Sequence, residues 1–330
     1  MTASQNTQPI LVLAPARSYS SIFAACLGAN PACYAFPELE LCHGGETVGD
    51  ILENDRLLPL GFDRYCRSGL LRALAELTFG DQSSDSVIRA RDWLTNRSQW
   101  TGTCVMSHLF ALVAPKRAVE KSPGTTRSNE AIARCVSRFR RASFVHLIRD
   151  PLSTATSWAR LVSGYGAYSR NDLIVQGLEV WYAAHLRIMT IGQWIDPSRF
   201  LTVRAEDFLA DPVEWLRRCA DTFGLPSSCE SIESMTHPER SSYASLGPPE
   251  APGGFDPAFL RAPQLQIHPL ARQGRFDELI VPPDLLARIC ELGARFGYRD
   301  FRMDPGVPSE PSIAVNDTFC DGPDTLHASC

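Results

Sequence analysis

The sequence predicts an α/β fold, in which helices flank a central, mainly parallel β-sheet. Two observations carry this prediction. Short, continuous apolar runs, which are typical of buried strands, recur along the chain. Between them lie longer segments with apolar residues at intervals of three and four, which is the pattern of amphipathic helices. The alternation of the two patterns indicates strand–helix–strand units.

Strands and helices alternate through the first half of the chain. A buried strand at Ile10–Ala14 is followed by a polar loop and by a helix that includes Ile22–Leu27. The helical interval predicts three more helices, and two short apolar runs predict strands. The helices are Arg64–Phe79, Ser84–Trp100 and Asn129–Phe139, and the strands are Cys104–Ser107 and Ala118–Glu120.

The second half begins with the clearest strand after the first, Ser143–Ile148. Asp150 is suited to cap the following helix and Pro151 to its first turn, and that helix continues through Leu161. Three helices and a strand are predicted further on. The helices are Leu173–Trp194, Pro212–Phe223 and Leu285–Phe296, and the strand is Phe200–Val203.

These elements predict one domain over residues 10–303, between a flexible N-terminus (1–9) and a C-terminal tail (304–330). Regularity fails between residues 227 and 281, where Pro and Gly cluster. Irregular segments of that length are usually functional or disordered, so we expect a long loop region there.

Composition excludes several classes of function. The net charge of −5 over 330 residues gives no general attraction to nucleic acid or to an anionic membrane, so an anion site must be a local cluster of donors. The first nine residues lack the pattern of a secretory signal, and no apolar run can span a bilayer. We therefore expect a cytoplasmic protein. The eleven cysteines are odd in number and contain no C-x-x-C pair, so we expect no metal site.

A polar loop, Pro15–Ser21, lies between the first strand and the first helix. A helix N-terminus is a natural anion site, and Arg17 with three serine hydroxyls strengthens that interpretation. On the loop alone, simple helix capping by Ser20 or Ser21 beside a solvated Arg17 has equal weight. The loop lacks G-x-x-x-x-G-K-[ST], which argues against a nucleotide-triphosphate hydrolase and against obligatory magnesium.

A second anion site is predicted where the strand Ser143–Ile148 ends. Arg149 follows the strand end, where ligands of open α/β sheets bind, and Ser157 lies about two helical turns further on. Taken alone, a salt-bridging arginine and a packed serine are equally good interpretations. Two anion motifs in this order and context make coincidence much less favoured.

With these two motifs the chain resembles the family of PAPS-dependent sulfotransferases, whose 5′-phosphosulfate loop has the sequence P-x-[RK]-[ST]-G-[ST]-[ST]. The matching residues are Pro15, Arg17, Ser18, Ser20 and Ser21, and Tyr19 replaces the glycine. The resemblance implies a P-loop-type sheet, the loop Arg17–Ser21 at the 5′ end of PAPS, and Arg149 with Ser157 at its 3′-phosphate.

Other segments extend the resemblance over roughly residues 10–298, towards the bacterial, polyketide-associated and tyrosyl-protein branches. Glu120–Pro123 resembles their K-[ST]-P segment, and Val203–Phe208 resembles R-Y-E-D-L. Arg272, Gln273 and Gly274 resemble the R-K-G that closes over the 3′-phosphate. The resemblance then implies that the irregular region 227–281 contributes a lid and acceptor contacts.

The resemblance also implies catalytic roles. Arg17 and Lys121 would stabilise charge as PAP leaves, and Glu38, 21 residues after Arg17, would take the acceptor proton. Glu40 lies where polyketide-associated members carry a histidine. Either the two nearby carboxylates, Glu38 and Glu40, raise the pKa of one of them, or Glu40 is only a solvated neighbour. The cytosolic branch has a histidine base in the middle of the chain, and His108 is the position to consider for it. A lone histidine there is more often structural, so His108 ranks behind Glu38. Three further histidines are weaker candidates: His146, which the strand pattern directs to the core, His43 and His268.

The leading hypothesis is therefore transfer of a sulfuryl group from PAPS, without a metal, to a hydroxyl or amine of a small-molecule, lipid or natural-product acceptor. The acceptor is either free or bound to a carrier protein. The alternative is a non-catalytic nucleotide-binding or scaffold protein that retains the fold, which the substitution at Tyr19 favours. A phosphotransferase of the related P-loop type is disfavoured by the missing G-K-[ST].

Overall fold

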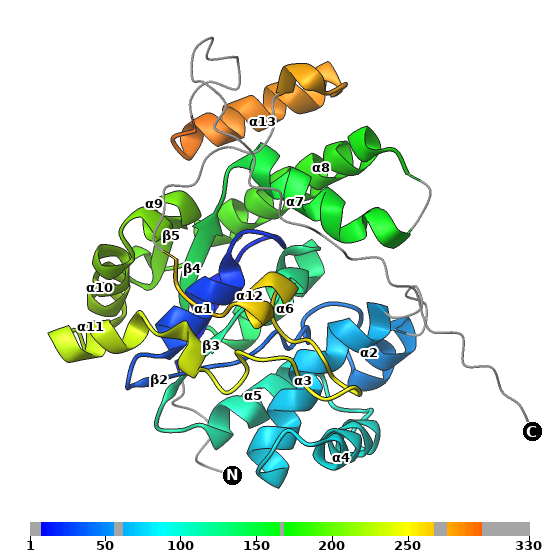
Figure 1. Ribbon diagram of the computed structural model, residues 1–330, viewed down its shortest axis with the longest axis vertical. Coiled ribbons are helices and arrows are strands. Elements are labelled where there is room, and N and C mark those ends of the chain that lie inside the picture. The colour runs from blue at the N-terminus through cyan, green and yellow to red at the C-terminus, as the bar shows by residue number, and fades with distance from the viewer. Residues whose placement is uncertain (1–7, 56–61, 166–167, 267–275, 299–330) are drawn as a thin grey trace, which may run out of the picture.

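The computed structural model describes residues 8–55, 62–165, 168–266 and 276–298. Within these ranges five strands form one parallel sheet in the order β2-β3-β1-β4-β5 (Figure 1). The strands are β1 (Ile10–Leu13), β2 (Cys33–Ala35), β3 (Arg117–Glu120), β4 (Ser143–Ile148) and β5 (Phe200–Arg204). The predicted fold class is confirmed.

Helices connect and cover the strands (Figure 1). The α-helices are α1 (Ser20–Gly28), α2 (Val48–Asp55), α3 (Phe62–Phe79), α4 (Ser84–Thr95), α5 (Gly102–Leu112), α6 (Asn129–Arg138), α7 (Pro151–Val162), α8 (Arg170–Gly192), α9 (Ala205–Ala210), α10 (Pro212–Phe223), α11 (Cys229–Met235), α12 (Pro257–Arg261) and α13 (Pro283–Arg295). Five short 3₁₀ turns are η1 (Pro123–Thr126), η2 (Ser163–Tyr165), η3 (Pro197–Arg199), η4 (Pro238–Arg240) and η5 (Phe276–Glu278). None of the described helices is long and apolar enough to cross a membrane.

One predicted strand is wrong. Cys104–Ser107 lies inside α5, which Thr101 caps by accepting a hydrogen bond from the Cys104 N–H. The buried residues of α5 include Val105, Met106 and Leu109, which is helical spacing. A four-residue apolar run does not distinguish a buried strand from one face of a helix.

Two further differences concern short segments. Strand β2 was not predicted, because three residues are too few to show a period of two. The helix predicted over Ser84–Trp100 ends at Thr95, and the chain then turns so that the rings of Trp93 and Trp100 lie 5.7 Å apart.

The strands alternate their side chains between two faces of the sheet. Leu11 and Leu13 pack in a core with helices α3, α4, α5 and α6. Ile10 and Val12 pack on the opposite face with α1, α9, α10 and α11. Figure 1 shows α9–α11 gathered on one side of the molecule and α2–α5 on another. A third core joins α7, α8 and α13 beyond the end of β4.

The stretch 227–281, predicted to be irregular, contains two short helices, α11 and α12, within its described part. The segment just before α12 contacts the loop Pro15–Ser21, since the Asp256 N–H donates to Ser21 Oγ (2.9 Å). Part of this irregular stretch therefore lies at the carboxyl edge of the sheet.

Candidate functional site

The parallel sheet brings the predicted site residues to one edge. Arg17, Lys121 and Arg149 follow β1, β3 and β4, and Glu38 follows β2. Because carboxyl ends of parallel strands lie at the same edge, residues far apart in the sequence meet there. Contacts among these residues define a site with a two-arginine end and a lysine–glutamate end.

The loop before α1 has an unusual backbone. Arg17 and Tyr19 adopt left-handed conformations with φ of 70° and 60°, and Tyr19 stands at the N-cap of α1. The three serines of the loop, Ser18, Ser20 and Ser21, are buried. Ser18 Oγ has no hydrogen-bond partner among the described residues. A buried hydroxyl without a partner is costly, which makes Ser18 Oγ a candidate hydrogen-bond donor to a ligand.

Tyr19 keeps the backbone conformation for which the glycine of the family pattern is suited. Its φ of 60° is in the region that a side chain disfavours. The phenol ring compensates, because the Arg149 guanidinium lies over it, with the guanidinium carbon 4.4 Å from the ring centroid. Tyr19 therefore combines a left-handed backbone with a contact between the two predicted anion motifs.

This backbone strain leads to a first prediction. We expect the variant Tyr19→Gly to be more stable than Tyr19→Ala by about 1 kcal/mol, because both lose the ring but only alanine is strained at positive φ. Urea denaturation gives both free energies of unfolding.

The matched control is Arg91, an exposed position inside α4. There the order should reverse, because glycine is the poorer helix former by about 1 kcal/mol. Equal stabilities of the two Tyr19 variants would contradict a left-handed Tyr19.

Arg149 and Ser157 join the loop from the other side. Arg149 Nη1 donates to the Arg17 carbonyl oxygen (2.7 Å), and Arg17 Nε donates to Ser157 Oγ (3.0 Å). Arg149 is 5% exposed, and its Nε has no partner among the described residues. Trp181 Nε1 donates to the Arg149 carbonyl (2.9 Å), which fixes the backbone there. The two predicted anion motifs thus form one continuous cluster.

The start of α7, which follows Arg149, is also fixed. The Asp150 side chain caps α7 as predicted, accepting from the Ser153 N–H (2.8 Å). Its own N–H donates to Glu206 Oε1 (2.8 Å), and Tyr298 OH donates to Glu206 Oε2 (2.7 Å). Glu206 belongs to the segment Val203–Phe208, which resembles R-Y-E-D-L. Through its hydrogen bond to Asp150, this segment fixes the backbone next to Arg149.

Glu38 and Lys121 form the other end of the site as an ion pair between Oε1 and Nζ. The Lys121 side chain is 3% exposed and that of Glu38 is 27% exposed. Burial raises the pKa of Glu38, the Lys121 ammonium opposes that rise, and Glu40 adds to it. The expected influence of a second carboxylate on the pKa of Glu38 is therefore present, although Lys121 is the nearer charge.

A buried network holds the turn that carries Glu38. The Glu40 N–H donates to Ser122 Oγ (2.8 Å), and Glu40 Oε1 accepts from the Gly124 N–H (3.1 Å). Ser122 Oγ in turn donates to Glu120 Oε1. Burial raises the pKa of Glu120 to about 7. The segment Glu120–Gly124 therefore positions the glutamates in addition to presenting Lys121.

The histidines take other places. His108 stacks on Trp93 with ring centroids 5.1 Å apart and meets Trp100 edge-on at 6.0 Å. Burial and the Arg97 charge lower the pKa of His108. These aromatic neighbours of His108 belong to the α4–α5 region and not to the Glu38–Lys121 pair.

Of the remaining histidines, His146 is buried as predicted, with Nε2 2.8 Å from Nδ1 of His185. His43 Nε2 lies 3.5 Å from Arg127 Nη1. His268 and the segment Arg272–Gly274 lie outside the described residues.

One site residue was not foreseen from the sequence. Asp256 forms an ion pair with Arg17, and its backbone N–H donates to Ser21 Oγ (2.9 Å). Asp256 lies in the stretch with no regular pattern, so no periodicity or motif placed it. The one available signal was the D-P pair Asp256–Pro257, which marks a helix start.

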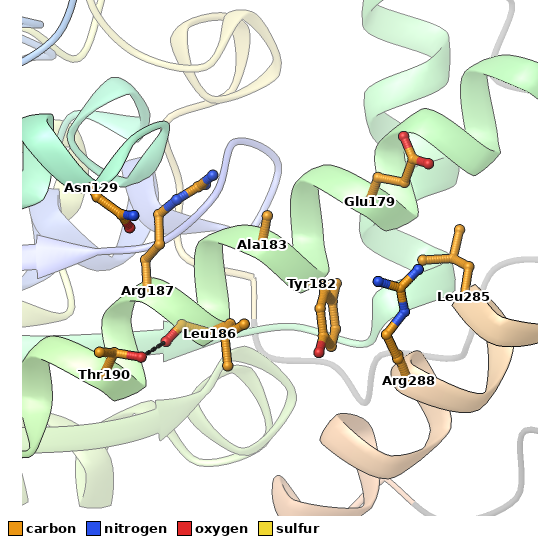
Figure 2. A pocket seen from close by; sticks show the side chains of 9 residues that line it. All are labelled: Asn129, Glu179, Tyr182, Ala183, Leu186, Arg187, Thr190, Leu285 and Arg288. Atoms are coloured by element: carbon orange, nitrogen blue, oxygen red, sulfur yellow. Dashed lines mark hydrogen bonds between the residues drawn. The ribbon is translucent and has the colours of Figure 1, made fainter.

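A separate groove of about 570 Å³ lies between α8 and α13 (Figure 2). Arg187 and Arg288 point into this region, but Arg288 pairs with Asp284 (2.9 Å) and Arg187 donates to the Thr126 carbonyl (3.2 Å). None of its lining residues belongs to the predicted site.

Comparisons with known proteins bear on the family and the fold of the chain. A family model described as "Sulfotransferase family" matches residues 9–228. The comparison with curated protein sequences found no match. Three similar solved structures are the sulfotransferase domain of the Synechococcus PCC 7002 olefin synthase, the sulfotransferase domain of the curacin biosynthetic pathway, and the sulfotransferase STF9 of Mycobacterium avium.

The olefin synthase domain is 22% identical with a TM-score of 0.68, over 89% of this chain and 97% of that chain. The curacin-pathway domain is 20% identical with a TM-score of 0.69, over 89% and 99%. STF9 is 15% identical with a TM-score of 0.51, over 89% and 78%. At these identities the likeness shows the fold.

Proposed function

The chain belongs to the sulfotransferase family, and from this premise we propose that it transfers a sulfuryl group from PAPS to a hydroxyl or amine of an acceptor. The proposal rests mainly on one observation: the loop Arg17–Ser21 and the pair Arg149 and Ser157 lie in contact as one cluster. Arg17 Nε donates to Ser157 Oγ (3.0 Å), and Arg149 Nη1 donates to the Arg17 carbonyl (2.7 Å). A ligand with anionic groups at two ends suits such a cluster.

The chemistry of the cluster fits PAPS. Ser18 Oγ and Arg149 Nε are buried without a partner among the described residues, and both are donors suited to phosphate oxygens. We assign the loop Arg17–Ser21 to the 5′-phosphosulfate and the pair Arg149 and Ser157 to the 3′-phosphate. Arg272, Gln273 and Gly274, outside the described residues, are assigned to the 3′-phosphate by the family resemblance alone.

The catalytic step divides between the two ends of the site. PAPS supplies the sulfuryl group: a sulfur–oxygen bond to the acceptor forms as the sulfur–oxygen bond to the phosphate breaks, and PAP leaves with the electron pair. The Glu38 carboxylate takes the acceptor proton, and Lys121 and Arg17 stabilise charge that develops on the leaving side. Support for Glu38 comes from its partial exposure beside the buried ammonium of Lys121. His108 is the second candidate for the base.

This assignment predicts the pH dependence of the reaction. Burial raises the pKa of Glu38, so kcat/KM should fall on the acid side through a pKa above the usual value of 4.5 for glutamate. In Lys121→Met the opposing positive charge is removed, so the carboxylate is disfavoured further and the acid limb moves to higher pH. A pH profile of kcat/KM for both proteins measures the shift.

The exposed Lys116 provides the control, since Lys116→Met removes the same charge from the surface. Its profile should coincide with that of the unmodified protein. If the acid limb of the kcat/KM profile lies at the same pH in Lys121→Met as in the unmodified protein, titration of Glu38 does not produce that limb.

The acceptor is proposed as a small molecule, a lipid or a natural-product intermediate, either free or bound to a carrier protein. Support comes from two structural neighbours, which are sulfotransferase domains of an olefin synthase and of the curacin biosynthetic pathway. Each neighbour covers 89% of this chain. The acceptor contacts are expected near Glu38, at the lysine–glutamate end.

Product analysis by mass spectrometry tests transfer. Incubation with PAPS and hydroxyl-bearing acceptors, offered both free and on a carrier protein, should yield a product heavier by one SO₃. Glu38→Gln should lower the rate at which that product forms by about 10²–10⁴-fold. Binding of PAP without a sulfated product from any acceptor class would favour the alternative, a nucleotide-binding or scaffold protein with the same fold.

A further inference from the structure

Four residues just before α12, Gly253–Asp256, run along the proposed site, and we refer to them as the strap. The Gly254 carbonyl accepts from the Glu38 N–H (2.7 Å). The Phe255 ring centroid lies 5.8 Å from Lys121 Nζ. The strap therefore touches both members of the lysine–glutamate pair before it reaches the phosphate loop.

Asp256, the last residue of the strap, takes three polar partners. Its Oδ2 pairs with Arg17 Nη1, and its N–H donates to Ser21 Oγ (2.9 Å). Its Oδ1 accepts from the Ala258 N–H (2.8 Å) and so caps α12. The Arg17 and Asp256 side chains are 19% and 24% exposed. One carboxylate thus neutralises the arginine proposed to hold the 5′ end of the donor.

Buried contacts fix the position of the strap. Arg72 is 1% exposed and donates from Nη1 to the Gly253 carbonyl (2.8 Å) and from Nε to Gln82 Oε1 (2.6 Å). Gly254 has a φ of +120°, and a Cβ there would lie 3.0 Å from Gly69 Cα. Phe255 is 3% exposed. These buried contacts hold the backbone of the strap in place. The Asp256 carboxylate therefore lies beside Arg17 because of how the strap packs, and not through a chance contact at the surface.

A carboxylate and a phosphate or sulfate compete for the same guanidinium hydrogens. A phosphosulfate bound at Arg17 would also be repelled by the negative charge of the Asp256 carboxylate, which pairs with the same arginine. From this we propose that Asp256 is an internal counter-ion of the donor site, which the donor must displace from Arg17, so that Asp256 weakens the binding of donor and product. The inference rests on the proposed function, since it takes Arg17 as a ligand of PAPS.

Isothermal titration with PAP tests it, without the need for an acceptor. Asp256→Asn is the decisive variant, because asparagine removes the charge but still caps α12. We expect it to bind PAP about tenfold more tightly than the unmodified protein, and Asp256→Glu, which restores the charge, to bind about as weakly as the unmodified protein. Asp196→Asn removes a charge from another capping aspartate, at η3, and should leave the affinity unchanged.

The outcomes separate the two levels of the proposal. If all proteins bind PAP and Asp256→Asn binds no more tightly than the unmodified protein, the counter-ion role is wrong and the proposed function stands. If Asp256→Asn and Asp256→Glu bind equally tightly, the gain comes from altered structure, and the counter-ion role is again wrong. If no protein binds PAP, the proposed function fails, and the role of Asp256 fails with it.

Discussion

Arg149→Ala is expected to weaken PAP binding by about a hundredfold or more. Arg149 is 5% exposed, and its Nε has no partner among the described residues. Hydrogen bonds to charged groups contribute about 1.5–3 kcal/mol each, and two to one phosphate reach or exceed a hundredfold in affinity. The variant also loses the bond to the Arg17 carbonyl, which loosens the 5′ loop.

The measurement is a titration of the variant with PAP and with AMP, which lacks the 3′-phosphate. PAP affinity should fall to that of AMP, whereas AMP affinity should fall much less. Arg218→Ala, which removes an exposed arginine from α10, is the matched control and should bind PAP normally. Equal losses of affinity for PAP and AMP would mean that Arg149 supports the loop Arg17–Ser21 but does not bind the 3′-phosphate.

The second large effect is expected for Glu38→Gln, which should lower kcat by about 10²–10⁴-fold, the range of general base catalysis. PAP affinity should change little, because Glu38 lies at the lysine–glutamate end of the site. The substitution leaves the buried ammonium of Lys121 without its carboxylate, so the free energy of unfolding should fall by about 1–2 kcal/mol, a value reduced for the partial exposure of Glu38. Thermal denaturation must therefore show folded protein before the kinetics are interpreted.

His108→Asn provides the comparison, since His108 is the second candidate for the base. It stacks on Trp93 among residues of the α4–α5 region, and its loss should leave kcat within a fewfold of normal. Retention of activity in Glu38→Gln together with its loss in His108→Asn would reverse the assignment of the base.

The sequence predicted the sheet well where strands are buried on both faces. The strand predicted at Ser143–Ile148 has the same bounds as β4, all six residues of which are buried. The sequence does not predict the three-residue strand β2, and it predicts a strand at the helical Cys104–Ser107, because runs of three or four residues carry too little periodicity to separate strand from helix.

Site residues that belong to a local sequence motif could be predicted, whereas a residue that tertiary packing brings to the site could not. The loop Arg17–Ser21 and the strand end at Arg149 are contiguous motifs, and the structure joins them through hydrogen bonds of 2.7 and 3.0 Å. Asp256 lies 239 residues from Arg17, and its approach depends on the buried Arg72 that anchors the strap. No local pattern contains that information, because it arises from tertiary packing.

Tyr19 lies between these cases. The sequence identified the departure from glycine, and the structure shows that the residue keeps the left-handed backbone at φ of 60°. What a single sequence does not reveal is the partner that compensates for the strain. That partner is Arg149, 130 residues further along the chain, whose guanidinium lies 4.4 Å from the ring centroid.

The central claim is that one site holds both anionic ends of PAPS. Calorimetric titration of the unmodified protein with PAP and with AMP tests it most directly. The account predicts that PAP binds at least about a hundredfold more tightly, because only PAP places a phosphate at Arg149 and Ser157. Equal affinities for PAP and AMP, or no binding of PAP, would contradict it.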